Sequence, residues 1–317
     1  MANDDNRLAF ERPSKLLVEF SIPAVVGVML NAMYNLIDTA FLGNALPDGS
    51  GVAVTTIAFP VMMVLLAFVQ LAGMGGNALA AIHLGKGDRK SVEKILGNTV
   101  FLLFVVAALV ALACTLFLNE ILAFLSTPDE LYGKTGIFVR IICYGFVCQC
   151  MSFGLNNFLR TDNRPKMALI TMVVCSSVCI LFNAILVIGF ELGVAGSAIA
   201  TVLGQGSGAI PILYYFIKSA KSTFKLRAKN LVPNGMLVAN ILVMGLASFA
   251  MNLATAVIGV VFNWAVSAWG PSCVYGVQGS LASIGVAQKV STFLFMPFVG
   301  LSMGAQPIIG FNYGARN

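Results

Sequence analysis

The sequence predicts an all-α protein that crosses a membrane several times. Apolar residues make up 58% of its 317 residues, whereas Asp, Glu, Lys and Arg together make up only 10%. A soluble domain usually carries about 25% charged residues, because its surface faces water. The apolar residues also gather in stretches at least as long as the roughly 20 helical residues that cross a bilayer. We expect helices, because an open sheet would leave backbone groups unpaired in lipid.

Eight apolar stretches are long enough to span the membrane, and a polar or basic segment separates each from the next. The first follows the charged segment from Met1 to Lys15, which lacks the small-residue cleavage site of a signal peptide. Several stretches are longer than a bilayer requires, so tilt or extension beyond the membrane is expected. The longest polar break precedes the seventh stretch. We expect the spans at residues 16–43, 52–83, 92–117, 135–159, 167–190, 194–217, 236–267 and 276–310.

Positive charge alternates between the loops. Of the 19 Lys and Arg residues, 16 fall in alternate loops, and the intervening loops hold only Lys134. Loops rich in Lys and Arg stay in the cytoplasm, so we expect both chain ends there and an even number of spans. The net charge of +6 therefore reflects topology, and we expect no nucleic-acid partner. The 16 residues are Arg7, Arg12, Lys15, Lys86, Arg89, Lys90, Lys94, Arg160, Arg164, Lys166, Lys218, Lys221, Lys225, Arg227, Lys229 and Arg316.

A weak internal repeat relates the two sides of the longest polar break. The segment from Gly73 to Asp88 matches the segment from Ser302 to Asn317 at a constant offset of 229 residues, with three identical positions. Transporters are often built from such repeats. We therefore expect a six-helix N-terminal lobe (1–217), a cytoplasmic linker (218–235) and the first two helices of a parallel second lobe (236–317). A ninth helix should begin where the chain stops, so we expect a C-terminally truncated protein.

Charge inside a span is the usual sign of a functional position in a membrane protein. Arg140 lies about one turn from the outer end of its helix, where its long side chain can reach the interface, so we interpret it as structural. Lys289 lies near the middle of the eighth span, where it either pairs with an acidic group or contacts substrate or a proton. Asp38 is the strongest candidate, with Tyr34 one turn earlier on the same face. This carboxyl group is a proton carrier, a cation ligand or an inert hydrogen-bonded group.

Uncharged polar residues recur along the spans and predict a polar cavity or path, although each alone is more often a contact between helices. A kink is expected at Pro23, because proline removes a backbone hydrogen bond. Six of the seven cysteines lie within spans as small packing residues, so we expect no metal site. The sequence contains no hydrolase, metalloprotease or P-loop motif, and we expect neither an enzyme nor a cofactor. The candidates for lining a substrate cavity are Asn35, Gln70, Gln205, Gln278, Lys289 and Gln306.

Five segments in family order resemble the multidrug and toxic compound extrusion (MATE) family of efflux transporters. The resemblance covers nearly the whole chain, and no single segment decides it. The five are PAVVGVMLNAMYNLIDTAFLG from Pro23, GKGDRK from Gly85, NNFLRTDNRPK from Asn156, GVAGSAIATVLGQ from Gly193 and AQPIIGFNYGARN from Ala305.

The resemblance implies twelve helices in two six-helix lobes, with export of organic cations and other drugs in exchange for H⁺ or Na⁺ by alternating access. Many members carry an aspartate where this chain has Val187. The coupling site would then hold one carboxylate, which weakens a Na⁺ site and leaves Asp38 protonatable. The positions that match the family's coupling site are Pro23, Tyr34, Asp38, Asn157, Asn183 and Thr201.

Other functions stay open. A related lipid-linked-oligosaccharide flippase would need a strongly cationic cavity, for which only Lys289 and Arg140 are available. A membrane enzyme would need clustered catalytic residues, and a non-transporting fragment would explain the abrupt end. For the efflux antiporter we expect a monomer in the plasma membrane of a bacterium, with drugs or organic cations and the lipid bilayer as its partners.

Overall fold

The computed structural model describes residue 8 and residues 11–46 and 49–317, so the predicted loop cation Arg7 lies outside the described residues. All regular elements in this part of the chain are helical. They are α2 (Pro13–Ala45), α3 (Ser50–Gly85), α4 (Arg89–Phe124), α5 (Asp129–Tyr144), α6 (Phe146–Thr161), α7 (Pro165–Asn183), the π-helix η1 (Ala184–Gly189), α8 (Gly193–Lys218), the 3₁₀-helix η2 (Ala228–Leu231), α9 (Gly235–Trp269), the 3₁₀-helix η3 (Gly270–Ser272) and α10 (Gly276–Gly314).

The predicted spans correspond to these helices, with one difference. Within the described ranges, seven helices are long and apolar enough to cross a membrane, and an eighth span results if α5 and α6 are counted together. The expected helix at 135–159 is this pair, which is bent by 52°. The break falls at Gly145, where an added Cβ would lie 2.2 Å from a methyl group of Val202 on α8. Glycine therefore allows α8 to pack directly against the break.

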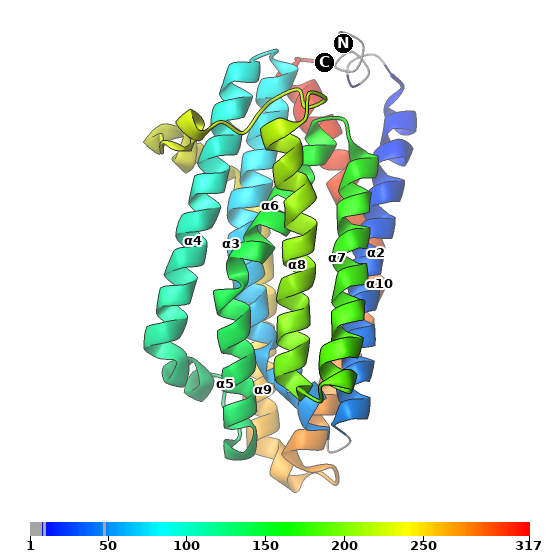
Figure 1. Cartoon of the computed structure of the whole chain (residues 1–317), viewed down its shortest axis with the longest axis vertical. Coiled ribbons are helices and arrows are strands. Elements are labelled where there is room, and N and C mark those ends of the chain that lie inside the picture. Colours follow the sequence, from blue (N-terminus) through cyan, green and yellow to red (C-terminus); the bar gives the residue numbers. More distant parts are fainter. Residues whose placement is uncertain (1–7, 9–10, 47–48) are drawn as a thin grey trace.

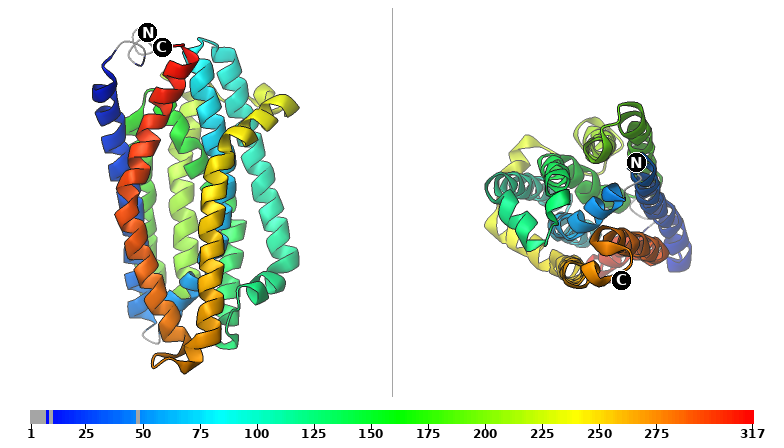
Figure 2. Two further views of the ribbon diagram at one scale, coloured as in Figure 1. Left: turned by 180° about the vertical axis from the view of Figure 1, so that it is seen from behind. Right: turned by 90° about the horizontal axis from the view of Figure 1, so that it is seen from below.

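The long helices run side by side as one bundle, with α3 near its centre (Figure 1). In the most apolar stretch of α3, 61% of the residues are buried. From behind, α9 and α10 lie beside each other and cover one side of the bundle (Figure 2). Their main neighbours are α3 for α9, and α2 and α3 for α10. At Gly75 an added Cβ would lie 2.0 Å from the carbonyl oxygen of Ile241, so α3 and α9 nearly touch there.

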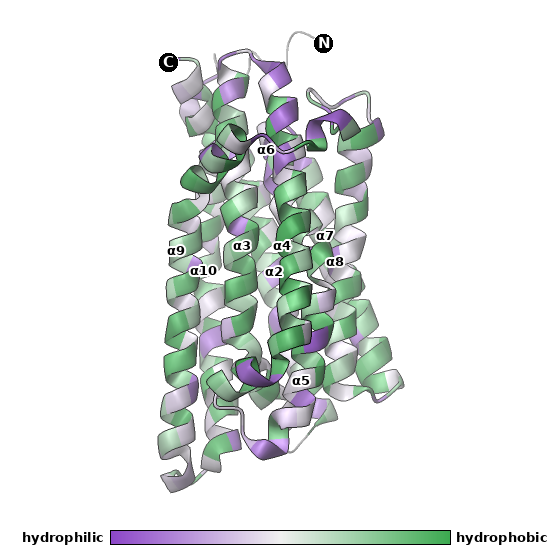
Figure 3. Ribbon diagram, turned by 90° about the vertical axis from the view of Figure 1, so that its left-hand side faces the viewer, coloured by the Kyte–Doolittle hydropathy of each residue, from purple (hydrophilic) through white to green (hydrophobic). Residues whose placement is uncertain are grey.

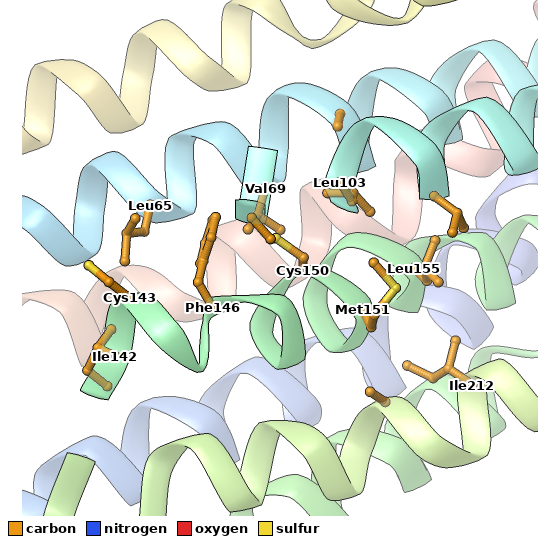
Figure 4. Packing of buried hydrophobic residues seen from close by; sticks show 14 of the residues in the cluster. Leu65, Val69, Leu103, Ile142, Cys143, Phe146, Cys150, Met151, Leu155 and Ile212 are labelled. Carbon is orange, nitrogen blue, oxygen red and sulfur yellow. The ribbon is translucent and has the colours of Figure 1, made fainter. Parts of the chain in front are cut away.

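The apolar core lies between α3, α4, α6 and α8. Leu65 and Val69 of α3 face the α5–α6 pair, and Phe146 lies between them and the bend (Figure 4). Leu103 of α4 and Ile212 of α8 are fully buried in the same cluster. Cys143 and Cys150 are buried within it as free thiols, which agrees with their interpretation as packing residues. This packing fixes the helices on which the polar groups described below are placed.

Hydrophilic residues gather at the two ends of the bundle, and the middle is mainly apolar (Figure 3). The loops at 86–88 and 162–164 and the segment 219–234 lie at one end, together with the end of α10 (Figure 1). We call this the basic end and the opposite one the far end. The placement of Arg160 in a loop was wrong: it belongs to the last turn of α6 and is only 1% exposed. Its guanidinium is held inside by the amide oxygens of Asn156 and Asn157.

The segment between α8 and α9 is folded against the bundle. Phe224 is fully buried and stacks on Phe216, with 5.6 Å between the ring centroids. The Thr223 backbone N–H donates to Asp162 Oδ1 at 3.0 Å, and the Asn234 backbone N–H donates to Asn98 Oδ1 at 2.7 Å. The polar break expected to link two lobes is therefore anchored to α4, α8 and the α6–α7 loop.

Candidate functional site

A polar cavity of about 180 Å³ lies in the half of the bundle toward the far end. It collects residues of α2, α3, α5, α6, α8 and α10, which the sequence separates by up to 265 positions (from Asn31 to Met296). Asp38 and Lys289 are the charged residues of its described lining. The lining consists of Asn31, Ala32, Tyr34, Asn35, Asp38, Thr55, Phe59, Met62, Met63, Leu66, Phe138, Gln149, Phe153, Thr201, Gln205, Lys289, Thr292 and Met296.

Asp38 is buried at the α2 side of this cavity, at 8% exposure. Its Oδ1 accepts a hydrogen bond from Ser197 Oγ at 2.7 Å, and the side chain of Asn183 lies close enough to interact with the carboxyl group. Helical periodicity explains part of this arrangement. Tyr34 and Asp38 are four residues apart on α2, and both line the cavity. Ser197 precedes Thr201 by four residues, so α8 presents two hydroxyls on one face.

Lys289 of α10 reaches the same place from the other side. Its Nζ donates to Thr39 Oγ1, directly after Asp38 in the chain, and to Thr55 Oγ1 at 3.2 Å. Its charge is close enough to interact with that of Asp38. The sequence left open whether Lys289 pairs with an acidic group or contacts a ligand. In this structure it faces an acidic group of α2 and is bound by hydroxyls of α2 and α3.

Asn183 lies where α7 changes from an α-helix to the π-helix η1. A π-helical turn within an α-helix widens the backbone and often occurs at functional sites. Asn183 is 1% exposed, and its Oδ1 has no hydrogen-bond partner among the residues that the structure describes. A buried amide oxygen without a donor is costly, so this atom is a natural acceptor for a water or a cation beside Asp38. Val187 is buried in η1.

Asn157 belongs to a second polar cluster, nearer the basic end. Its Nδ2 lies 3.0 Å from Met74 Sδ, and its Oδ1 accepts from Arg160 at 2.7 Å. Thr161 Oγ1 donates to Asn77 Oδ1 at 2.7 Å, and Asn77 Nδ2 donates to Gln306 Oε1 at 3.1 Å. These bonds join α10 to α3 and α6. We call Asn77, Asn156, Asn157, Arg160, Thr161 and Gln306 the polar junction.

The structure thus divides the predicted site residues between the cavity and other places. Gln70, Gln278 and Gln306 are outside the described lining of the cavity. Gln306 is instead part of the polar junction and also donates to the carbonyl oxygen of Met74 at 3.3 Å. Pro23 lies within α2, which is one α-helix from Pro13 to Ala45. The predicted residues that line the cavity or contact Asp38 are Tyr34, Asn35, Asp38, Asn183, Thr201, Gln205 and Lys289.

Sequence reasoning missed Ser197, Thr39 and Thr55. The signal for Ser197 was its four-residue spacing from Thr201, which places both on one face of a helix. The other two had no local signal, because Thr39 and Thr55 gain their role only from Lys289, more than 230 residues later in the chain.

A buried carboxyl beside a cavity, with an unpaired amide oxygen and a long, flexible cationic side chain nearby, is suited to take up and release a proton. Apolar spanning helices around such a cavity define the molecule as a multi-pass membrane protein of the transporter class.

Comparison with known proteins gives the family. A family model, MatE, matches residues 23–185 and 247–317. The multidrug export protein MepA of Staphylococcus haemolyticus (strain JCSC1435) is 24% identical over 312 residues, which cover 98% of this chain and 67% of that protein. The MATE multidrug transporter DinF-BH, whose structure was solved as a complex, has a TM-score of 0.88 at 28% identity, over 97% of this chain and 67% of that one.

A MATE family transporter in its outward-facing conformation has a TM-score of 0.86 at 21% identity, over all of this chain and 68% of that one, which is a likeness of fold. The chain therefore belongs to the MATE family of efflux transporters, as the sequence motifs indicated. It spans about two thirds of the length of the relatives that it matches.

Proposed function

We propose that this chain is a multidrug efflux antiporter that exports organic cations and other drugs in exchange for H⁺ by alternating access. The observation that carries the proposal is Asp38: a carboxyl group buried in the membrane region, beside a polar cavity, with neutral hydrogen-bond donors around it. The names of the relatives MepA and DinF-BH, both multidrug transporters, support the type of cargo.

The moving parts are two lobes. Residues 1–217 form the N-terminal lobe, 218–235 the linker, and 236–317 the part of the second lobe that this chain contains. The long contacts of α9 with α3 and of α10 with α2 then form the interface between the lobes. The anchored linker supports a division in which one lobe rocks against the other about the start of α9, with both chain ends in the cytoplasm of a bacterial cell and one chain acting alone.

Protonation of Asp38 is the coupling step. A neutral carboxyl group no longer attracts a cationic drug or Lys289, and it donates one hydrogen bond where the carboxylate only accepted. Ser197 and Asn183, and with them α8 and α7, must then rearrange, and α2 bends near Pro23. The lower affinity for the drug releases it to the outside. Coupling follows because the proton and the drug prefer different states.

The coupling ion is H⁺ rather than Na⁺. A Na⁺ site needs several oxygen ligands and tolerates no nearby cation. Val187 supplies no oxygen where other family members carry an aspartate, and Lys289 places an ammonium near Asp38. A single proton needs only one carboxyl group.

The test is ethidium efflux in inverted membrane vesicles under an imposed proton or sodium gradient. It uses the 317-residue chain, and also the chain extended by the last third of a longer relative. We expect proton-driven transport, and a decrease of about 10- to 100-fold in Asp38→Asn, the size of a typical coupling between two sites. Asp88→Asn is the matched control, because it makes the same chemical change at a residue outside the membrane that caps α4 through Ser91.

Transport that is unchanged in Asp38→Asn would contradict the coupling role. Transport that follows only the sodium gradient would contradict the choice of H⁺. If neither the chain nor its extended form moves ethidium although both are folded in the membrane, export of organic cations is the wrong function.

A further inference from the structure

The ammonium of Lys289 lies on the side of the cavity where Asp38 would attract a cationic cargo. The side chain extends from α10 to Thr39 and Thr55, so its ammonium lies on the same side as Asp38. Apart from these two charged residues, Tyr34 is the titratable side chain of the described lining. The charges of Asp38 and Lys289 therefore compensate each other, and the cavity is neutral overall when Asp38 is ionised.

The hydrogen bonds of Lys289 make this placement reversible. An ammonium has three donors, and the two threonine hydroxyls occupy two of them. Both hydroxyls also bond backbone carbonyls of their own helices, Thr39 to Asn35 O at 2.8 Å and Thr55 to Val52 O at 2.9 Å. They would keep these bonds if Lys289 left. The flexible four-carbon stem of lysine allows the ammonium to withdraw along α10.

We propose that Lys289 is a specificity-determining residue: it acts as an internal counter-cation of Asp38, and a cationic cargo must displace it to bind. This inference rests on the proposed function, because it assumes that organic cations enter this cavity. Lys289 thereby selects against weakly held monocations and ties cargo binding to the contact of α10 with α2 and α3. Neutral compounds do not compete for Asp38 and are unaffected by Lys289.

The size of the cavity supports displacement. Its volume of about 180 Å³ is smaller than the roughly 300–1,000 Å³ of sites for drug-sized ligands. A cargo of that size thus needs α10 to move outward, and the positive charge of a cationic cargo can then take over the interaction of Lys289 with Asp38.

The test measures binding of ethidium, a permanent monocation, and of Nile red, a neutral dye, to the 317-residue chain in nanodiscs. Lys289→Met keeps the length of the side chain and removes its charge. We expect it to bind ethidium about tenfold more tightly than the unmodified chain, a coupling typical of one close charge pair, with Nile red unchanged. In the double variant Asp38→Asn/Lys289→Met the gain is lost. Lys289→Arg keeps the positive charge, so it should bind ethidium no more tightly than the unmodified chain.

Lys134→Met is the control, because Lys134 also donates to a hydroxyl, Ser50 Oγ at 2.8 Å, but lines a different cavity. It should leave ethidium affinity unchanged.

The proposal is overturned if folded Lys289→Met binds ethidium no more tightly than the unmodified chain, if the affinity for Nile red increases equally, or if the gain persists without Asp38. If the unmodified chain and Lys289→Met both bind no ethidium, the proposed function fails as well; binding by the unmodified chain without a gain in the variant overturns the inference alone. Should Lys289→Met fail to fold, Lys289→Gln replaces it with the same expected gain.

Discussion

The cavity buries the carboxyl group of Asp38, and the polar junction buries the guanidinium of Arg160. The surroundings of these two groups differ in free volume and in hydrogen-bond partners. Asp38 faces an open volume, an oppositely charged lysine and, through Asn183, an amide oxygen without a described partner. Arg160 is 1% exposed, and Nη1 is bound by the amide oxygens of Asn156 at 2.8 Å and Asn157 at 2.7 Å. Neutral amides hold this guanidinium in place, and its described hydrogen-bond partners include no carboxylate.

Because of this difference, Asp38 can exchange its hydrogen-bond and charge partners, whereas Arg160 is held in one position. A charge beside free volume and unpaired acceptors can exchange partners at low cost, whereas a charge enclosed by oriented amides loses those bonds if anything moves. The cavity therefore suits binding and release, and the junction suits a fixed connection between α3, α6 and α10. Substitutions should accordingly affect function at Asp38 and Lys289, and stability at the junction.

The largest effect on stability is expected at Arg160. In Arg160→Ala two buried amide oxygens lose their donor and a large side chain leaves a void, so the free energy of unfolding should decrease by about 3 kcal/mol. Denaturation in detergent, followed by circular dichroism, measures it. Lys166→Ala also removes a positive charge, but from an exposed position in the first turn of α7. It should change the free energy of unfolding by less than about 0.5 kcal/mol. If both substitutions decreased the free energy of unfolding equally, the buried bonds of Arg160 would contribute no more to stability than an exposed charge does.

A smaller effect is expected where the junction joins α3 to α10. Asn77 and Gln306 are hydrogen-bonded at 3.1 Å, so Asn77→Ala and Gln306→Ala should be non-additive by about 0.6 kcal/mol, the average for such bonds in membrane proteins. The same denaturation assay gives the double-mutant cycle. Asn252 bonds only the carbonyl of Ser248 in its own helix among the described contacts, so Asn252→Ala should be additive with Gln306→Ala. Full additivity of Asn77 and Gln306 would mean that the bond contributes nothing.

The smallest effect concerns two carboxyl groups outside the spanning helices. Burial raises the pKa of Asp162 above its ordinary value of 3.8, although bonds from Thr223 and Tyr215 oppose this. Hydrogen bonds from the side chain and backbone of Ser91 lower the pKa of Asp88. Because the pKa of Asp162 is raised in the folded state, its contribution to stability is lost as pH rises from about 3.8 through the folded pKa. Because the pKa of Asp88 is lowered in the folded state, its contribution to stability is lost as pH falls from about 3.8 through the folded pKa.

Replacement by asparagine should therefore change the pH dependence of the melting temperature in opposite directions at the two positions. As pH rises from about 3.8, the melting temperature of Asp162→Asn minus that of the unmodified chain should become more positive. For Asp88→Asn the same difference should become less negative as pH falls below about 3.8, because the ionised form of Asp88 stabilises the fold. A pH profile of the same sign in both variants would show that the burial of Asp162 does not govern its titration.

Much of the candidate site was predictable because it depends on short spacing within one helix. Tyr34 and Asp38, four residues apart, were expected on one face, and both line the cavity. Gln70 and Gln278 resembled them in composition yet lie outside the described lining. A polar residue in a span indicates that a partner is needed, but the sequence does not say whether that partner is a ligand, water or a neighbouring helix.

The internal repeat shows the same limit. The offset of 229 residues paired Asn77 with Gln306 as equivalent positions, and in the structure they are also bonded to each other. Related positions in two copies meet when the copies pack around a common axis, which the offset alone does not reveal.

The sequence by itself determined the helices, their approximate ends and the membrane class, because apolar length and charge act on each span separately. Only the tertiary structure decided that Lys289 faces Asp38, that Arg160 is buried by two asparagines and that the α5–α6 span bends where α8 packs against Gly145. Each of these depends on how distant helices are rotated and placed against one another, and that is set by side-chain packing across the whole bundle.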